Sequence, residues 1–173
     1  HVIPHHDLDA ATVEIFRDIF DVNVFGTWKL SVSAMPALRA ASGNIVNVSS
    51  IAGLRPTGSS IPYASSKAAL NHLTVLMAKV TGPEVRVNAV CPGDVDSPML
   101  RGQAKNFGDG NEQRYYDRLL VGYPQGRNAR FITPREVAEF VWFLSQPEAA
   151  AITGANLSID FGLSAGIFPR DDQ

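Results

Sequence analysis

The sequence predicts an α/β fold: a doubly wound parallel sheet with helices on both of its faces. Short apolar segments alternate along the chain with helical segments of ten or more residues, and this alternation is typical of parallel sheets whose crossovers are helices. Each apolar segment is almost uninterrupted, as expected of strands buried on both faces. The 173 residues, 45% hydrophobic and 18% charged, suit one globular domain with a core of its own.

Four segments have helical character. In the first segment, residues 9–20, apolar residues recur every three or four positions, as on one face of a helix. A break near Asn23 separates this segment from the second, residues 24–41. Thr133, Pro134 and Glu136 form a helix-start signal before the fourth, because Thr can cap, Pro suits the first turn and Glu can close a capping box. We expect helices over residues 9–20, 24–41, 63–79 and 134–145.

Three β-branched, apolar segments predict buried strands, at residues 44–48, 85–90 and 155–159. Ligands of open α/β sheets bind beyond the carboxyl ends of the strands, so the residues that follow each segment are the candidates for function. Between the second strand and the last helix, residues 98–130 are polar and weakly periodic. We expect this segment to be a mobile flap over the substrate.

The charge balance excludes several classes of partner. A net charge of −2, a pI of about 6.1 and the lack of any basic block predict no nucleic-acid or membrane binding. Cys91 is the only cysteine, which rules out an internal disulfide and suits a reducing compartment, so we expect a cytoplasmic protein. The chain begins at His1 rather than Met, with no signal-peptide pattern, and we expect it to be part of a longer protein.

Tyr63 and Lys67 are the strongest candidates for chemistry. Four residues apart on a predicted helix, they share one face, so the phenol and the ammonium can converge. A phenol has a pKa near 10, and a neighbouring cation lowers it. The sequence therefore predicts Tyr63 as a general acid/base.

Further motifs surround this pair in a fixed order. Ser50 precedes Tyr63 by 13 positions and Asn23 precedes it by 40. With them the sequence resembles the short-chain dehydrogenase/reductase family over nearly its whole length. The matching stretches are residues 21–26 (DVNVFG), 47–53 (NVSSIAG), 63–67 (YASSK), 86–93 (RVNAVCPG) and 152–154 (ITG).

The resemblance implies hydride transfer between NAD or NADP and the carbonyl or alcohol carbon of a small alcohol or ketone. Tyr63 would be the acid/base, Lys67 would hold the ribose hydroxyls and lower the pKa of Tyr63, Ser50 would bind the reacting oxygen, and Asn23 would place a water in a proton relay. Such preorganised donors stabilise the negative charge that builds on oxygen.

The same resemblance assigns cofactor contacts at the end of the second strand. The implied set is Tyr63, Lys67, Pro92, Gly93, Val95 and Ser97. Ser97 stands where the family more often has Thr, and Phe161 replaces a usual Gly in the last strand's Asp-Gly-Gly pattern, which puts the local turn in doubt.

The family's glycine-rich pyrophosphate turn does not occur in the sequence, since the one Gly-x-Gly, at Gly108 and Gly110, falls in the flap. By the resemblance, residues 1–173 are a partial Rossmann-like domain without its N-terminal strands. Residues 44–48 should then form an unpaired apolar edge. We expect marginal stability, or a homodimer or homotetramer that packs through residues 24–41 and 63–79.

Other interpretations remain open at this stage. A noncatalytic binding or oligomerisation module would keep the fold without turnover. No metal site is expected, because His1, His5 and His6 with Asp7 and Asp9 are more simply a terminus with chance histidines. A serine hydrolase is excluded, since neither Ser49 nor Ser50 lies in a nucleophile elbow.

Overall fold

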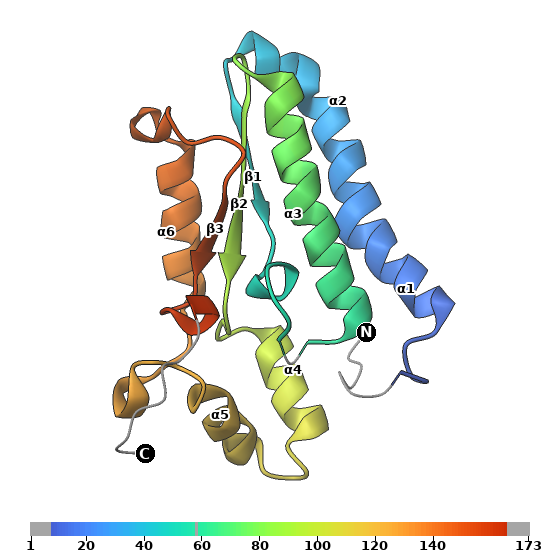
Figure 1. The fold of residues 1–173 in the computed structure, drawn as a ribbon, viewed down its shortest axis with the longest axis vertical. Helices are drawn as coiled ribbons and strands as arrows, with labels where there is room; N and C mark the ends of the chain where they lie inside the picture. The colour runs from blue at the N-terminus through green and yellow to red at the C-terminus, as the bar shows by residue number, and fades with distance from the viewer. Residues whose placement is uncertain (1–7, 58, 166–173) are drawn as a thin grey trace.

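Three parallel strands form the centre of the computed structural model, which describes residues 8–57 and 59–165 (Figure 1). They are β1 (Asn44–Val48), β2 (Arg86–Pro92) and β3 (Asn156–Ile159), in the order β1-β2-β3. Both pairs are parallel, with Val48 opposite Val90 and Val90 opposite Leu157. This confirms the predicted parallel α/β sheet. Among the described residues β1 pairs with β2 alone, so it is the edge strand that the sequence predicts.

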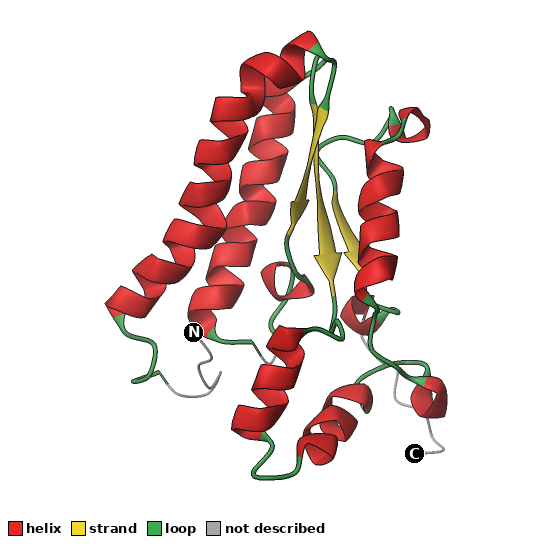
Figure 2. Ribbon diagram, turned by 180° about the vertical axis from the view of Figure 1, so that it is seen from behind, coloured by secondary structure: helices red, strands yellow, loops and turns green. Residues whose placement is uncertain are grey.

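Helices cover both faces of the sheet (Figures 1 and 2). On one face lie α2 (Thr27–Ala40) and α3 (Ile61–Thr81), and on the other lies α6 (Pro134–Ser145). Side chains of β2 point alternately to the two faces of the sheet, so the strand packs against both helix layers. Val87 joins a cluster with Met77 of α3, and Val90 joins a cluster with Leu144 of α6. All four side chains are almost completely buried.

The first two predicted helices are one continuous helical run. Between α1 (Val13–Phe20) and α2 the chain stays helical through a π-helical segment, η1 (Asp21–Gly26). The expected break at Asn23 is therefore wrong. A π turn widens the helix without interrupting it, and the hydroxyl of Thr27 donates to the Asn23 carbonyl at 3.0 Å.

Residues 98–130 are more regular than their sequence predicts. They form α4 (Pro98–Phe107) and α5 (Glu112–Leu120), which stand beyond the carboxyl ends of the strands (Figure 1). Side-chain caps begin both helices, from Ser97 and Asn111. Leu100, Ala104 and Tyr123 are buried and tie the segment to the domain. Its role as a substrate flap stays a prediction.

Short 3-10 helices complete the described chain: η2 (Ile51–Gly53), η3 (Gly126–Asn128), η4 (Pro147–Ala149) and η5 (Leu163–Ala165). Before η5, Phe161 has a φ of 52° and Gly162 a φ of 82°. Phe161 thus takes the left-handed conformation that favours the glycine usual there.

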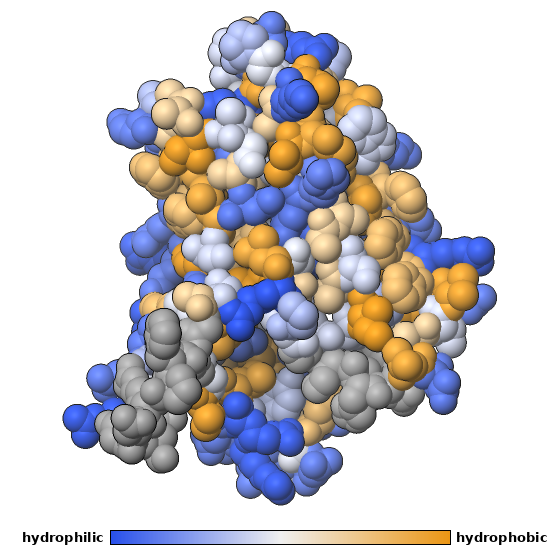
Figure 3. All heavy atoms as spheres, viewed as in Figure 1, coloured by the Kyte–Doolittle hydropathy of each residue, from blue (hydrophilic) through white to orange (hydrophobic). Residues whose placement is uncertain are grey.

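Apolar side chains remain on the outer surface of the α1–α2 helix. Phe25 is 59% exposed and Trp28 is 48% exposed, and apolar atoms are visible along this side of the molecule (Figure 3). No helix within residues 8–57 and 59–165 is long and apolar enough to cross a bilayer.

Candidate active site

Ser50 is fixed at the carboxyl end of β1 by the local backbone. It begins η2, where its hydroxyl accepts a hydrogen bond from the Ala52 amide at 3.1 Å. The residue before it is tied to the neighbouring strand, because the Ser49 amide donates to the Val90 carbonyl at 2.8 Å. The hydroxyl of Ser50 therefore projects where parallel sheets bind ligands.

Tyr63 and Lys67 lie in the first two turns of α3, which begins at Ile61 with Pro62 in its first turn. The ammonium of Lys67 lies 5.6 Å from the centre of the Tyr63 ring. It also donates to the carbonyl oxygen of Val48, the last residue of β1, at 3.0 Å. The helix face thus brings the pair to the strand end that carries Ser50.

The pKa values of these groups reflect burial. Burial raises the pKa of Tyr63 above its ordinary value, and a hydrogen bond with the Ser50 side chain acts in the opposite direction. Burial likewise lowers the pKa of Lys67, because it disfavours the charged ammonium. The sequence predicts that Lys67 lowers the pKa of Tyr63. In the structure the net pKa of Tyr63 is raised, because loss of solvation outweighs the hydrogen bond with Ser50. The effect of Lys67 on that pKa stays a prediction.

Asn23 is connected to the same helix through Ser66. The Asn23 amide donates to the Ser66 hydroxyl at 3.0 Å, and that hydroxyl donates to the backbone carbonyl of Tyr63 at 2.7 Å. Ser66 is fully buried. This serine is a positioning residue that the sequence analysis missed. Its position three residues after Tyr63 places it on the same side of the helix, and this spacing could have identified it from the sequence.

The end of β2 supplies the next part of the site. The Gly93 amide donates to the Ile159 carbonyl of β3 at 3.0 Å. A Cβ at Gly93 would lie 3.1 Å from the Cβ of Asp160, so only glycine fits without a shift. Val95 forms a parallel bridge with Ile132.

Two other residues of the predicted cofactor set have structural partners. Pro92 is the last residue of β2 and is buried. The Ser97 hydroxyl caps α4 by accepting from the Leu100 amide at 3.4 Å. Any contact of Ser97 with a cofactor stays a prediction.

A cleft of about 890 Å³ joins the two strand ends to α4 and α5. Its lining includes Ser50, Gly93 and Asp94 from the strand ends, with Tyr115 and Arg118 from α5. The full lining is Ser50, Ile51, Arg55, Pro56, Thr57, Ser59, Gly93, Asp94, Gln103, Asn106, Phe107, Asp109, Tyr115, Arg118, Leu119 and Leu163.

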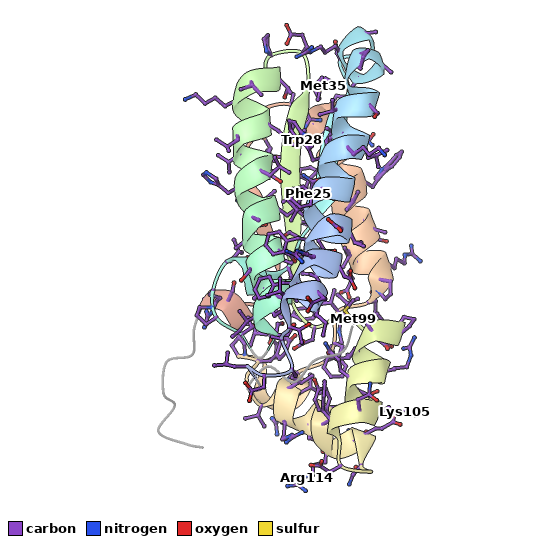
Figure 4. The ribbon with its side chains drawn as sticks, turned by 90° about the vertical axis from the view of Figure 1, so that its right-hand side faces the viewer. Phe25, Trp28, Met35, Met99, Lys105 and Arg114 are labelled. Carbon is purple, nitrogen blue, oxygen red and sulfur yellow. The ribbon has the colours of Figure 1, made fainter. Side chains whose placement is uncertain are left out.

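Tyr63 and Lys67 are not among the lining residues, and Tyr63 reaches the cleft wall through its hydrogen bond with Ser50. Figure 4 shows Lys105 of α4 and Arg114 of α5 at the periphery of the molecule, and neither residue lines the cleft. Of the alternative metal site, His1, His5, His6 and Asp7 lie outside the described residues.

Comparison of the sequence with models of known protein families identifies the family of this chain. A family model described as enoyl-(acyl carrier protein) reductase matches residues 2–164. The chain belongs to the short-chain dehydrogenase/reductase family. Ser50, Tyr63 and Lys67 thus form, in this short-chain dehydrogenase/reductase, the cluster on which the family resemblance rests.

Relatives of this short-chain dehydrogenase/reductase carry the names of oxidoreductases. It is 57% identical over 161 residues to a Streptomyces violaceoruber protein named as ketoacyl reductase 2 of granaticin polyketide synthase, covering 92% of this chain and 60% of that protein. It is 40% identical over 162 residues to 2-(S)-hydroxypropyl-CoM dehydrogenase 3 of Xanthobacter autotrophicus, with the same coverage. The chain therefore spans about 60% of the length of the curated relatives it matches.

Solved structures agree with the fold. Aldohexose dehydrogenase of Thermoplasma acidophilum superposes with a TM-score of 0.88 at 31% identity, covering 99% of this chain and 68% of that one. ElxO, solved with NADP bound, superposes with a TM-score of 0.80 at 28% identity, covering 95% of this chain and 64% of that one. The three-stranded sheet thus corresponds to part of a Rossmann-like fold.

Proposed function

We propose that this protein transfers a hydride between NAD or NADP and the carbonyl or alcohol carbon of a small substrate, with Tyr63 as the general acid/base. The observation that carries the proposal is the convergence of Ser50, Tyr63 and Lys67 at the carboxyl end of β1. The oxidoreductase names of its relatives support the reaction class.

The nicotinamide cofactor, when bound, supplies the hydride that reduces the carbonyl carbon. As that bond forms, the C=O π pair moves onto oxygen. Ser50 donates a hydrogen bond to this oxygen, and Tyr63 transfers its hydroxyl proton to it, which completes the alcohol. In the oxidation direction the Tyr63 phenolate accepts the alcohol proton. The burial that raises the pKa of Tyr63 keeps its hydroxyl protonated, which is the form that reduction requires.

The donor groups of this site fit the nicotinamide end of such a cofactor. Lys67 and Tyr63 offer an ammonium and a hydroxyl that can hold ribose hydroxyls, and Gly93 lines the cleft beside Ser50. Gly108 and Gly110 lie at the turn between α4 and α5 rather than between a strand and a helix, so they do not form a pyrophosphate turn. The proposal takes NAD and NADP together, because the described residues include nothing that distinguishes them.

Titration with NADH and with NADPH, followed by nicotinamide fluorescence, tests cofactor binding. Saturable binding that Lys67→Met weakens and Lys105→Met leaves unchanged is the expected result, since Lys105 is exposed on α4, away from the cluster. Turnover of simple ketones with the bound cofactor then separates an enzyme from a noncatalytic binding module. A folded protein that binds neither cofactor would contradict the proposal.

We also propose that the protein assembles as a homodimer or homotetramer through α2 and α3. Trp28 on α2, with Val75 and Leu76 on α3, gives these helices exposed apolar side chains. Burying them against a second copy would remove apolar surface from water. Sedimentation at several concentrations, compared with Trp28→Glu, tests the assembly: a monomeric wild-type protein would contradict it.

A further inference from the structure

Asp94 is the first side chain beyond Gly93 at the carboxyl end of β2, and the reaction proposed above does not use it. It lines the same cleft as Ser50, which follows the neighbouring strand β1. Adjacent strands are about 4.8 Å apart. A molecule whose reacting oxygen lies at Ser50 can therefore reach Asp94 within a few bonds.

Buried hydrogen bonds fix the position of this carboxylate. The Tyr123 hydroxyl donates to Oδ2 of Asp94 at 3.1 Å and accepts from the Asp94 amide at 3.0 Å. Tyr123 is only 2% exposed, so close packing holds its ring in place. The backbone is held as well, because the Asp94 carbonyl accepts from the Ile132 amide at 3.0 Å.

The second oxygen of Asp94 is available to a ligand. Within residues 8–57 and 59–165, Oδ1 accepts no hydrogen bond and no cation forms an ion pair with Asp94. The cleft is open to solvent at this residue, which is partly exposed. Its negative charge acts on two neighbours, raising the pKa of Tyr115 and of Tyr123 in addition to their burial.

An ionised carboxylate accepts hydrogen bonds and donates none. The group that suits Oδ1 is therefore a donor on the substrate, and a substrate carboxylate at this place would be repelled. Each cation of the cleft is engaged elsewhere: Arg55 donates to the Ser164 carbonyl, and Arg118 donates to the Phe107 carbonyl at 3.1 Å. Neither forms an ion pair with Asp94.

We propose that Asp94 is a specificity-determining residue that binds a hydroxyl group of the substrate, close to the carbonyl or alcohol carbon that reacts. The natural substrates are then hydroxyketones or the corresponding vicinal diols. This inference rests on the proposed hydride transfer and adds the substrate class to it. Tyr123 is the positioning residue that aims the carboxylate into the cleft.

The expected effect follows from leaving a charged carboxylate without its hydrogen-bond partner. Hydrogen bonds to charged groups are the strong ones, and losing one at a site built for it costs about 10- to 100-fold in kcat/KM. Wild-type protein should therefore prefer 1-hydroxy-2-ketones over 2-ketones of the same length by about that factor.

The test uses three substrate series and four variants of the protein. Hydroxyacetone and butanone differ by one hydroxyl at nearly equal size, longer homologues extend the pair, and aminoacetone provides an ammonium donor instead. Asp94→Ala should abolish the preference for hydroxyketones while keeping turnover of plain ketones. Asp94→Asn keeps the shape and one acceptor oxygen, so it should keep part of the hydroxyl preference and lose any preference for aminoacetone.

Two further variants separate a local effect from a structural one. Tyr123→Phe should reduce the preference by raising KM for hydroxyketones more than it lowers kcat for plain ketones. Asp117→Asn changes an acid on the outer face of α5 and should keep the wild-type ratio, because Asp117 pairs with Gln113 away from the cleft.

Equal rates for hydroxyketones and plain ketones, in wild type and Asp94→Ala alike, would overturn the role of Asp94 and leave the hydride transfer standing. A preference for the ammonium substrate alone would overturn the hydroxyl assignment. Absence of both cofactor binding and ketone turnover would overturn the proposed function and this inference together.

Discussion

The two sides of the cleft are built in different ways. The catalytic wall comprises residues 44–53, which reach the cleft at Ser50 and Ile51, and residues 61–81, which pack against them without lining it. It is well anchored in the core: α3 alone buries eight residues, and the buried Asn47 side chain donates to Thr74 at 2.9 Å. The substrate wall, residues 98–120, is anchored less, through Leu100 and Ala104 of α4. Helix α5 buries no residue, and its side-chain bonds, such as Gln113 to Asp117 at 2.8 Å, are exposed.

In the proposed reaction we expect this difference to separate chemistry from substrate recognition. A buried hydrogen bond is costly to break because its partners cannot turn to water, whereas an exposed one exchanges with solvent at little cost. The catalytic wall therefore holds Ser50, Tyr63 and Lys67 in one arrangement, and the substrate wall can change its side chains without loss of the fold. Substitutions in the catalytic wall should therefore change activity and stability more than substitutions in the substrate wall.

The largest effect is expected on the catalytic wall at Tyr63. Tyr63→Phe removes the acid/base hydroxyl and keeps the ring, so kcat should fall about 10²- to 10⁴-fold with little change in thermal stability. Steady-state kinetics and thermal unfolding measure the two quantities. Tyr116→Phe on the substrate wall is the matched control, since Tyr116 packs on Phe131 and does not line the cleft. Similar losses in both variants would contradict the division.

Ser50→Ala should have the next largest effect. Removing one donor from the developing oxyanion lowers kcat about 10²- to 10³-fold. The Ser50 hydrogen bond also lowers the pKa of Tyr63, so its loss should raise that pKa further. Alcohol oxidation needs the phenolate, and the rising limb of its pH profile should therefore move to higher pH. An unshifted limb would show that Ser50 does not act on Tyr63.

Local sequence signals predicted the catalytic wall well. Each strand is marked by its own apolar run, and the spacing of Tyr63 and Lys67 fixes their common helix face. The same reasoning placed Gly93 at a strand end. These features depend on residues that are near one another in the chain, and sequence patterns report mainly on such local structure.

Contacts between distant residues were not predictable in this way. Asn23 meets Ser66 across 43 positions, and Tyr123 meets Asp94 across 29. Neither pair has a local pattern, because packing of separate elements decides it. The two helices of the substrate wall were missed because their sequences are polar on average, although their apolar residues do recur at a helical period. Side-chain caps begin both helices, and two buried residues, Leu100 and Ala104, hold α4 in place.

Substitutions at one glycine in each wall compare how tightly the two walls are packed, through the free energy of unfolding. A Cβ at Gly53 would lie 2.5 Å from the backbone carbon of Lys67, so Gly53→Ala must displace η2 or α3 and should cost about 1–3 kcal/mol. Nothing lies within 4 Å of a Cβ at Gly102 in α4, and Gly102→Ala should stabilise the protein by about 0.5–1 kcal/mol. Chemical denaturation measures both. Equal changes at the two sites would contradict the tighter packing of the catalytic wall.

The smallest effect is expected where the substrate wall leads into α6. Hydrogen bonds from Arg130, and from the backbone and side chain of Thr133, hold the pKa of Glu136 at about 2, below its ordinary value of 4.5. A group with a lowered pKa stabilises the fold fully above its ordinary value, because the unfolded chain takes up the proton first as the pH falls. The contribution should therefore decline between pH 4.5 and 2.

Glu136→Gln removes this pH-dependent contribution. The difference in thermal midpoint between wild type and Glu136→Gln should be small and constant at neutral pH and should shrink as the pH falls below 4.5. Glu139→Gln is the control, since Glu139 pairs only with Arg135 on the exposed face of α6 and does not cap the helix. A difference that grows on acidification would contradict the capping role. Because these hydrogen bonds are exposed, the whole effect should be weaker than that of Gly53→Ala.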